Sequence, residues 1–460
     1  MELKGRKVVV LGLGDTGLSM ARWLARRGAD VRVADSRAAP PHAERLAREL
    51  PKIPLATGAF SEMTLRGADL VAISPGLDRR DEPVADAIRC GVPVVGDVEL
   101  FAQALKEGAA AATPNVLAVT GSNGKSTVTA MAGEVCRAAG RRTVVAGNIG
   151  IPVLDALGAI EDGAEAPEVF VLELSSFQLE STGSLEPDAA AMLNLTEDHL
   201  DRYDGMAGYA AAKARVFSGN GVQVLNRDDP RSMDMARPGR TVFTFGGGRP
   251  RTDTEWGIGP ARGGDALMRG SHPLMRLEQM PVAGLHNAEN ALAAHALAHA
   301  IGAPDEALAR AMNSFEGLPH RMQRVIEHEG VLFLDDSKGT NVGATVAALA
   351  GLRRPVVLIA GGDGKGQDFA PLAPAVGARA RAVVLIGRDA EKLARALAGT
   401  GVPVERAAGM DEAVRAAFRA SRAGDAVLLS PACASYDMFR DYVHRAEAFV
   451  AAAQKLARSG

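Results

Sequence analysis

Cysteine, net charge and long apolar runs are all scarce in this sequence of 460 residues. Its three cysteines, Cys90, Cys136 and Cys433, lie far apart and form no CxxC pair, so we expect neither a disulfide framework nor a zinc site. The net charge is only −3, from 52 basic and 55 acidic residues, which excludes a global attraction to nucleic acid or to membranes. An anionic ligand must therefore be bound by local groups of Lys, Arg and backbone N–H.

No apolar run reaches the roughly 18 residues that a transmembrane helix needs. The N-terminus leads directly into an apolar stretch at 7–11, which is too short for the apolar region of a secretion signal and lacks a cleavage site. We therefore expect a cytoplasmic protein with no membrane insertion and no nucleic-acid partner.

The chain is long enough for about three domains of ~150 residues each. Short β-branched runs alternate with helical stretches rich in Ala, Leu and Arg, which indicates an α/β fold with parallel sheets covered on both faces. The expected strands are 8–11, 31–34, 70–74, 116–120, 169–174, 356–360, 383–387 and 426–430.

Three segments can be separated, at 1–110, 111–318 and 319–460. The small-residue stretch 108–114 reads as the first linker, and the third segment begins after 317–319. Inside the second segment, 237–280 is irregular and dense in Gly, Pro, Arg and Thr. The strand fragment at 241–245 predicts a small side sheet there.

The first glycine-rich loop, 12–17, matches GxGxxG after a strand and before a helix, and Asp35 ends the next strand. The glycines let backbone N–H groups approach a diphosphate, and Asp35 could bind a ribose hydroxyl. Alone, this pattern favours an NAD-dependent oxidoreductase. Many other ligands bind the same fold, and a purely structural turn is a further alternative.

The second glycine-rich loop, 119–127, also joins a strand to a helix and carries Gly124-Lys125-Ser126. Its consecutive N–H groups would form a nest for phosphate oxygens, Lys125 would reach the β- and γ-phosphates, and the Ser126 hydroxyl would bind Mg²⁺. Val119 stands where the strict phosphate-loop pattern has glycine. The context of strand, nest, lysine and helix still predicts a nucleotide triphosphate site.

Three downstream residues are candidates for metal chemistry. Glu173 ends an apolar strand and could hold Mg²⁺, although an ordinary strand-end charge is an alternative. His199 lies in the polar stretch 194–201 and could ligate a second metal or contact the reacting phosphate. Lys213 sits among alanines on an expected helix, and its residue type and position alone predict a solvated helix lysine.

Over nearly its full length the sequence resembles the Mur ligase family, and within it the branch that adds D-glutamate. The phosphate loop is shared with all Mur ligases and with folylpolyglutamate synthetase, whereas SSFQL and SPACAS look specific to the D-glutamate branch. The matching strings are 120–127 (TGSNGKST), 147–150 (GNIG), 172–179 (LELSSFQL), 194–202 (NLTEDHLDR), 211–213 (AAK), 286–287 (HN), 317–321 (GLPHR), 336–341 (DSKGTN), 361–365 (GGDGK) and 429–435 (LSPACAS).

This resemblance implies a Rossmann-like UDP-binding domain, a central ATPase domain and a C-terminal Rossmann-like domain that binds the amino acid. It implies an ATP-dependent ligase that joins D-glutamate to UDP-N-acetylmuramoyl-L-alanine through an acyl phosphate, in peptidoglycan precursor synthesis. A Mur-type or folylpolyglutamate-type ligase with another acceptor remains the alternative. The expected partners are these two substrates and ATP, and the expected state is a monomer.

The resemblance also assigns roles to single residues. It implies catalytic roles for Lys125, His199 and a carbamylated Lys213, and two Mg²⁺ ions held by Ser126, Glu173, His199 and Lys213. The residues implied to bind nucleotide are Gly121, Ser122, Asn123, Gly124, Lys125, Ser126, Thr127, Asn287, Asn290, Arg321 and Asp336. Those implied for the UDP-linked substrate are Asp15, Thr16, Asp35, Ser36, Gly76 and Asn148, and those for D-glutamate are Lys338, Thr340, Lys365, Ser435 and Tyr442.

Two positions depart from the family pattern. Tyr442 stands where we expect Phe, and Ala446 stands where we expect Gly. Both put the fine shape of the D-glutamate pocket in doubt, but not the reaction. A non-catalytic nucleotide switch is a last alternative, and it predicts ATP hydrolysis that does not depend on a small amine.

Overall fold

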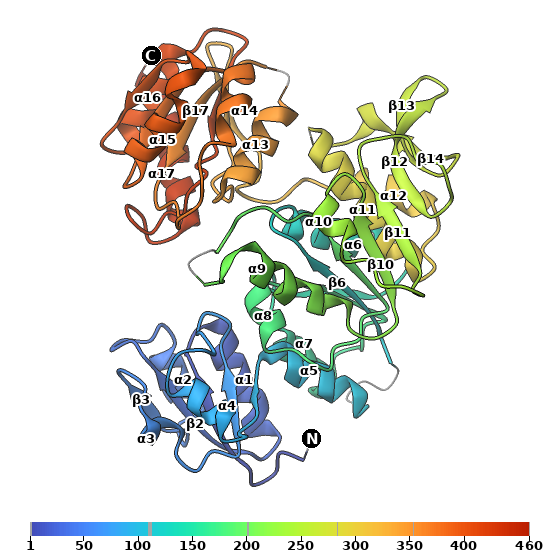
Figure 1. Ribbon diagram of the computed structural model, residues 1–460, viewed down its shortest axis with the longest axis vertical. Helices are drawn as coiled ribbons and strands as arrows, with labels where there is room; N and C mark the ends of the chain where they lie inside the picture. Colours follow the sequence, from blue (N-terminus) through green and yellow to red (C-terminus); the bar gives the residue numbers. More distant parts are fainter. Residues whose placement is uncertain (1, 109–112, 200–201, 283, 353, 460) are drawn as a thin grey trace.

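The computed structural model describes residues 2–108, 113–199, 202–282, 284–352 and 354–459, and these residues form three β-sheets that follow one another along the chain (Figure 1). The first is parallel, with the order β3-β2-β1-β4-β5. Its strands are β1 (Lys7–Leu11), β2 (Asp30–Asp35), β3 (Leu55–Thr57), β4 (Leu70–Ile73) and β5 (Val94–Val95), and its helices are α1 (Asp15–Arg26), α2 (Ala43–Glu49), α3 (Glu62–Leu65), α4 (Val84–Arg89) and α5 (Asp97–Lys106).

The central sheet has the order β14-β13-β12-β11-β10-β9-β6-β8-β7. Its strands are β6 (Asn115–Thr120), β7 (Thr143–Gly147), β8 (Val169–Glu173), β9 (Ala189–Met192), β10 (Val222–Asn226), β11 (Val242–Phe245), β12 (Glu255–Ala261), β13 (Gly264–Arg269) and β14 (His272–Arg276). Its helices are α6 (Lys125–Ala138), α7 (Val153–Glu161), α8 (Ser176–Glu180), α9 (Gly205–Ala214), η1 (Arg215–Phe217), α10 (Pro230–Met233), η2 (Leu277–Gln279), α11 (Leu285–Ala300) and α12 (Glu306–Met312).

The stretch expected to hold a side sheet instead extends the central sheet. Strand β11 pairs with β10 in parallel and with β12 in parallel, and the antiparallel strands β13 and β14 follow. The small sheet is thus continuous with the core, because β11 supplies a hydrogen-bonding edge for both neighbours.

The third sheet has the order β15-β16-β20-β17-β18-β19, with only β15 antiparallel to its neighbour among the described strands. Its strands are β15 (Gln323–His328), β16 (Val331–Asp335), β17 (Val356–Gly361), β18 (Ala380–Ile386), β19 (Val404–Arg406) and β20 (Ala426–Leu429). Its helices are α13 (Val342–Gly351), α14 (Leu372–Arg379), α15 (Ala390–Leu397), η3 (Ala398–Thr400), α16 (Met410–Ala420) and α17 (Tyr442–Ser459).

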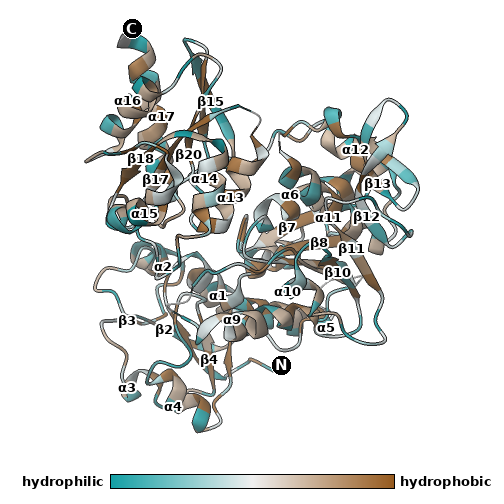
Figure 2. Ribbon diagram, turned by 45° about the horizontal axis from the view of Figure 1, so that its top comes forward, coloured by the Kyte–Doolittle hydropathy of each residue, from teal (hydrophilic) through white to brown (hydrophobic). Residues whose placement is uncertain are grey.

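Strand β17 shows why unbroken apolar runs form these sheets. Val356 and Leu358 pack into the core on one face of the sheet, while Val357 and Ile359 pack into the core on the other face. Successive side chains of a strand point to opposite faces, so a strand with helices on both sides must be apolar at every position. Figure 2 shows β17 and β18 in brown between helices that carry teal turns. The expected α/β fold class is confirmed.

The three sheets lie in sequence order along the long axis of the molecule, with the first at the blue end and the third at the orange end of Figure 1. The predicted boundary at 110–111 lies outside the described residues, and the boundary at 318–319 falls between α12 and β15. Among the described helices, none is both long and apolar enough to cross a bilayer.

Candidate active site

A cavity of about 200 Å³ lies where the central sheet faces the third sheet, and it collects most of the residues implied for nucleotide and metal. The implied residues that line it are Ser122, Asn123, Gly124, Lys125, Ser126, Thr127, Asn148, Glu173, His199, Asn287, Asn290, Arg321, Asp336, Lys338 and Thr340. These positions span more than 200 residues of sequence, so the folding of two sheets against each other creates the cavity.

The phosphate loop between β6 and α6 is hydrogen-bonded to the polar segment that follows β9. The backbone N–H of Asn123 donates to Asn194 Oδ1 at 2.8 Å, and the Ser122 hydroxyl donates to the Thr196 carbonyl at 2.9 Å. Gly124 has φ of 85°, and a Cβ there would lie 2.7 Å from Asn290 Oδ1. Only glycine fits this turn, which brings backbone N–H groups close to a phosphate.

Lys125 lies across its own loop. Its Nζ donates to the carbonyls of Gly121 and Ser122 at 2.9 and 2.8 Å. Burial lowers the pKa of its amine, and Glu173 partly opposes this effect. A phosphate bound in the nest would meet this cation in a site with little solvent, where charge attraction is strong.

The donor set around Ser126 and Glu173 suits a divalent cation. Glu173 is buried at the end of β8, and its Oε1 accepts a hydrogen bond from Asn148 Nδ2 at 2.6 Å. Its Oε2 is also buried and has no hydrogen-bond partner in the described part of the chain. Such an unpaired carboxylate oxygen is costly unless it binds a cation, and oxygen donors are those that Mg²⁺ prefers. Arg321 Nη2 donates to the Ser126 hydroxyl at 2.8 Å, which joins the two domains at this point.

His199 follows Asp198 on the other side of the loop. Burial lowers the pKa of its imidazole to about 4. The ring is therefore neutral at pH 7, so one ring nitrogen keeps a lone pair for a metal or a hydrogen-bond donor. His199 also packs on Phe177, with ring centroids 4.7 Å apart. Leu200 and Asp201, from the same sequence motif, lie outside the described residues.

Lys213 is buried beneath the phosphate loop, so the interpretation of it as a solvated helix lysine is wrong. It is 1% exposed, and its Nζ donates to the Gly121 carbonyl at 2.7 Å and contacts Thr120 Oγ1 at 3.4 Å. Burial, reinforced by Lys125, lowers the pKa of the Lys213 amine well below its ordinary value. The small alanines on α9 let this helix pack closely, which carries the long lysine side chain inward.

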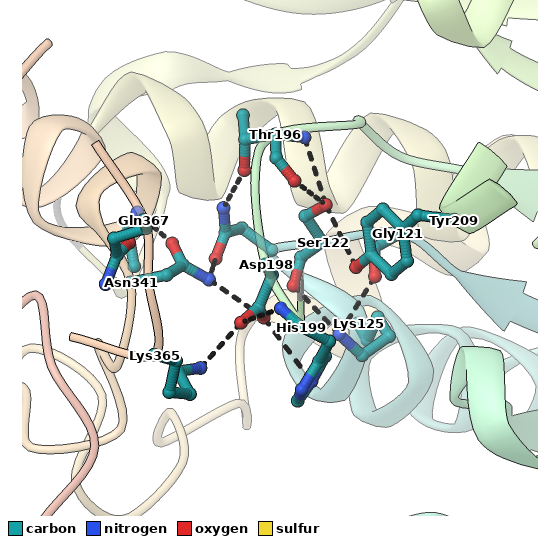
Figure 3. A network of polar contacts seen from close by, with 12 residues as sticks. Gly121, Ser122, Lys125, Thr196, Asp198, His199, Tyr209, Asn341, Lys365 and Gln367 are labelled. Carbon is teal, nitrogen blue, oxygen red and sulfur yellow. Dashed lines mark hydrogen bonds and ion pairs between the residues drawn. The ribbon is translucent and has the colours of Figure 1, made fainter. Parts of the chain in front are cut away.

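A polar network connects the central and third domains beside the cavity (Figure 3). Asp198 accepts from Lys365 Nζ at 2.6 Å and lies 3.6 Å from His199 Nε2. Asn341 Nδ2 donates to Asn123 Oδ1 at 3.0 Å and contacts Asp198 Oδ2 at 3.4 Å. From the third domain, Asn341 therefore contacts the phosphate loop, and Lys365 contacts Asp198 beside it.

A second cavity, of about 430 Å³, lies beside the first glycine-rich loop. Asp15 and Thr16 line it, and so does Asn148, which also lines the first cavity. A Cβ on Gly17 would lie 1.8 Å from the Gly12 carbonyl oxygen, so glycine is required for α1 to start tightly against β1. A long substrate held at this loop could therefore reach the phosphate loop past Asn148.

Asp35, Ser36 and Gly76 do not line that cavity. Asp35 is buried, and its carboxylate accepts from the Leu13 N–H at 2.6 Å and from Arg37 Nη2 at 2.6 Å. The hydrogen bond from Arg37 lowers the pKa of Asp35 to about 2. Asp35 thus holds the loop in shape, while Ser36 and Gly76 are exposed nearby.

Family models match all three parts of the chain. Residues 6–96 match the Mur ligase MurD-like N-terminal domain, 119–298 the Mur ligase middle domain, and 320–433 the Mur ligase glutamate ligase domain. The chain belongs to the Mur ligase family. It is 60% identical to the UDP-N-acetylmuramoylalanine--D-glutamate ligase of Thiobacillus denitrificans and 55% identical to that of Nitrosospira multiformis. The alignments cover 99% and 100% of this chain, and 98% of each relative.

Solved structures agree with this fold. The UDP-N-acetylmuramate-alanine ligase MurC of Thermotoga maritima is 20% identical with a TM-score of 0.58, over 98% of this chain and 99% of that one. MurF of Acinetobacter baumannii is 17% identical with a TM-score of 0.59, over 98% and 93%. The hypothesis of an NAD-dependent oxidoreductase is not supported, because every part of the chain matches this ligase family.

In this Mur ligase, the residues implied for D-glutamate divide into two groups. Lys338 and Thr340 line the first cavity, whereas Lys365, Ser435 and Tyr442 do not. Lys338 Nζ lies 3.7 Å from the centroid of the Tyr442 ring, a cation–π contact that connects the groups. Ser435 is buried, and Lys365 is paired with Asp198. Their roles as ligands of the amino acid stay predictions.

Asp198 and Asn341 are functional candidates that the sequence motifs contained but did not single out. Both lie within motif strings of the family, and Asp198 is the nearest carboxylate in sequence to His199. That adjacency was the available signal. Asn341 also accepts from the Ala344 N–H at 2.9 Å, so it caps α13 while its amide reaches the central domain.

A separate cluster of His295, His299 and Asp305 has ligand atoms within 4.8 Å of one another. Trp256 Nε1 donates to His295 Nδ1 at 2.8 Å. This bond leaves the proton of the neutral ring on Nε2, so the nitrogen that faces Asp305 is a donor and offers no lone pair to a metal. Arg269 also occupies Asp305 at 2.9 Å. We interpret the cluster as a structural polar network.

Proposed function

We propose that this Mur ligase joins D-glutamate to UDP-N-acetylmuramoyl-L-alanine with ATP, in peptidoglycan precursor synthesis. The observation that carries this proposal is the 60% identity, over 99% of the chain, to a relative named for that reaction. The two cavities, which share Asn148 in their linings, support it, because one lies at a diphosphate-type loop and the other at a triphosphate-type loop. We also propose that 1–110 binds the UDP-linked substrate, 111–318 binds ATP and 319–460 binds the amino acid.

The reaction has to turn a carboxylate oxygen into a leaving group. An oxygen of the alanyl carboxylate attacks the γ-phosphorus of ATP, the bond to the β,γ-bridging oxygen breaks, and ADP leaves. The D-glutamate amine then attacks the acyl carbon, phosphate leaves with the carboxylate oxygen, and the amine loses a proton as the amide forms. The first step brings two anions together, so charge stabilisation is its main requirement.

The residues of the chain meet this requirement from several sides. Lys125 and the N–H groups of the phosphate loop bind the β- and γ-phosphates, and Asn287 and Asn290 contact the nucleotide from α11. Arg321 and Asp336 close over it from the third domain. Closure would exclude water that otherwise hydrolyses the acyl phosphate. Burial raises the pKa of Asp336 to about 7, so this carboxyl exchanges its proton near neutral pH.

We propose two magnesium ions, and Glu173 Oε2, unpaired among the described residues, supports the first of them. Ser126 and Glu173 would hold one, and His199 with a carbamylated Lys213 would support the other. Bound magnesium would neutralise charge on the transferring phosphoryl group. Carbamylation needs a neutral amine, and the buried Lys213 has no carboxylate in ion-pair contact among the described residues. The monomeric state, the cytoplasmic location and the absence of a nucleic-acid partner stay predictions.

The test is release of phosphate from ATP with defined mixtures of substrates. We expect release to require Mg²⁺ and UDP-N-acetylmuramoyl-L-alanine, and to rise with D-glutamate but not with L-glutamate. Equal rates with both enantiomers would count against the amino-acid assignment. Release that does not depend on any small amine would favour the nucleotide switch instead.

A further inference from the structure

Two arginines stand on the wall of the cavity beside the first glycine-rich loop. Arg22 projects from α1 and Arg45 from α2, and they are the only lysine or arginine side chains that line it among the described residues. The acidic side chains on the same wall are Asp15 and Asp155. None of these four except Asp15 was a candidate from the sequence, because only the packing of α1, α2 and α7 brings them together.

The carboxylate of Glu49 accepts a hydrogen bond from the Nε of each arginine. Glu49 Oε2 accepts from Arg22 Nε at 2.7 Å, and Glu49 Oε1 accepts from Arg45 Nε at 2.8 Å. The guanidinium groups are therefore fixed side by side through Nε. Their terminal nitrogens are left for other partners, so Glu49 acts as a positioning residue.

The terminal nitrogens are only partly used. Arg22 Nη1 lies 3.2 Å from both oxygens of Asp155, whereas Arg22 Nη2 is buried and has no hydrogen-bond partner in the described chain. Arg45 is hydrogen-bonded through Nε alone within the same residues. A buried N–H donor without a partner is unfavourable, so a small shift of the Arg22 side chain toward an oxygen-rich anion in the cavity would gain a hydrogen bond. The Arg45 side chain is 46% exposed and lines the cavity, so it can meet such an anion directly.

The chemistry of the pair matches a diphosphate. A guanidinium presents parallel N–H donors that fit phosphate oxygens, and two arginines at a fixed separation can each meet one phosphoryl group. The cavity also lies beside the first turn of α1, where Asp15 and Thr16 begin a helix of 12 residues whose N-terminus favours anions. From there it extends to Asn148, which borders the phosphate loop.

We propose that Arg22 and Arg45 bind the diphosphate of the uridine-linked substrate, with Glu49 positioning both side chains. This inference rests on the proposed function and adds specificity residues to it. The competing explanation is structural. Arg26 and Arg27, at the C-terminal end of α1, pair with Asp162 and Glu161 at the C-terminal end of α7, so Arg22 could be one more link between two domains.

Calorimetric titration of uridine, UMP and UDP into the full-length protein separates these explanations. We expect Arg45→Ala to weaken UDP binding about tenfold at low salt and to leave uridine binding unchanged, because one charge-assisted contact to phosphate is lost. Arg45→Lys should recover part of the loss, since lysine keeps the charge but not the fork. Arg22→Ala should likewise weaken the binding of UDP and leave the binding of uridine unchanged.

Two matched controls test the structural alternative. Arg48 lies on α2 with Arg45 but is 75% exposed and lines no part of the cavity, and Arg26 makes an interdomain ion pair like that of Arg22. We expect Arg48→Ala and Arg26→Ala to bind UDP as the unaltered protein does. In steady state, Arg45→Ala should raise the KM for the UDP-linked substrate and leave the KM values for ATP and D-glutamate unchanged.

The possible results are distinct. Unchanged UDP binding in Arg45→Ala, or equal weakening of uridine and UDP, would overturn the inference while the proposed function stands. An equal loss in Arg26→Ala and Arg22→Ala would show that Arg22 acts through the domain contact, and would overturn its assignment. If the unaltered protein neither binds UDP nor uses a UDP-linked substrate, both the proposed function and this inference fail.

Discussion

Replacing Lys213 with alanine is expected to remove ligase activity while the fold persists. Lys213 Nζ lies 2.7 Å from the carbonyl oxygen of Gly121 and 3.4 Å from Thr120 Oγ1, directly beneath the loop that binds phosphate. A carbamate at this position would place a carboxylate-like anion beside the reacting phosphates. Lys213→Ala removes that anion and also removes an amine whose charged form is disfavoured by burial.

The magnitude follows from what the carbamate would support. Loss of a group that supports a bound metal typically costs about 10- to 100-fold in metal affinity or activity. Loss of one preorganised electrostatic contact at a reacting centre costs about 10²- to 10³-fold in kcat. Because Lys213 would act on magnesium next to the γ-phosphate, we expect kcat to fall by roughly 10²- to 10³-fold.

The assay is phosphate release at saturating substrates, with and without added formate or acetate. A short carboxylic acid can enter the space left by the side chain and restore part of the negative charge, so partial rescue is expected. Carbon-13 NMR after incubation with labelled bicarbonate should show a carbamate signal in the unaltered protein and none in Lys213→Ala. Lys106→Ala is the matched control, because Lys106 is half exposed and pairs with Glu186 on the surface.

Wild-type activity in Lys213→Ala would refute the carbamate role. So would the absence of a carbamate signal in fully active protein. A thermal unfolding curve for each variant separates loss of chemistry from loss of folding. An inactive variant that unfolds at an unchanged temperature but is not rescued by carboxylic acids would place Lys213 in the loop structure and not in metal binding.

Three further predictions address the loop, the domain contact and pH. Gly124→Ala should raise the KM for ATP at least tenfold and lower stability by about 1 kcal/mol, because the new Cβ would meet Asn290 in a left-handed turn; nucleotide titration and urea unfolding check this. Asp198→Asn should lower kcat/KM for D-glutamate at least tenfold by leaving Lys365 without its anion, whereas the exposed Glu197→Gln should not. Burial raises the pKa of Asp97 from 3.8 to about 6, so the stability that its protonated form contributes is lost as pH rises from about 4 to 6. Asp97→Asn should therefore remove a fall in the free energy of unfolding on the order of 3 kcal/mol across that pH window, measured by urea unfolding.

The phosphate loop was predictable from the sequence because all of its determinants are local. A strand, a nest of consecutive N–H groups, a lysine and a helix follow one another within 116–127, so no distant contact was needed to recognise them. Val119 in place of the first glycine did not prevent the prediction of the loop, because Gly121 and Gly124 adopt the positive φ angles that the turn needs. The alternation of apolar strands and helices predicted the parallel sheets for the same reason.

The parts that escaped prediction depend on packing between distant segments. Asp198 and Lys365 form an ion pair although they lie 167 positions apart, and no periodic pattern in the sequence predicts this contact. The burial of Lys213 depends on how closely α9 packs beneath the loop, which residue type alone does not reveal. The extension of the central sheet depends on which edge β11 pairs with, and its sequence is equally compatible with a separate sheet.

The first glycine-rich loop shows why a correct local prediction can lead to the wrong ligand class. In a dinucleotide-binding protein, the acid at the end of the second strand binds the ribose hydroxyls. Here the Asp35 carboxylate is engaged by the Leu13 N–H and by Arg37, so much of its hydrogen-bonding capacity serves the loop itself. The backbone N–H groups of the loop would still suit a diphosphate, and the surrounding side chains would decide which diphosphate binds. A substrate that extends past Asn148 to the phosphate loop fits that arrangement, because Asn148 lines both cavities.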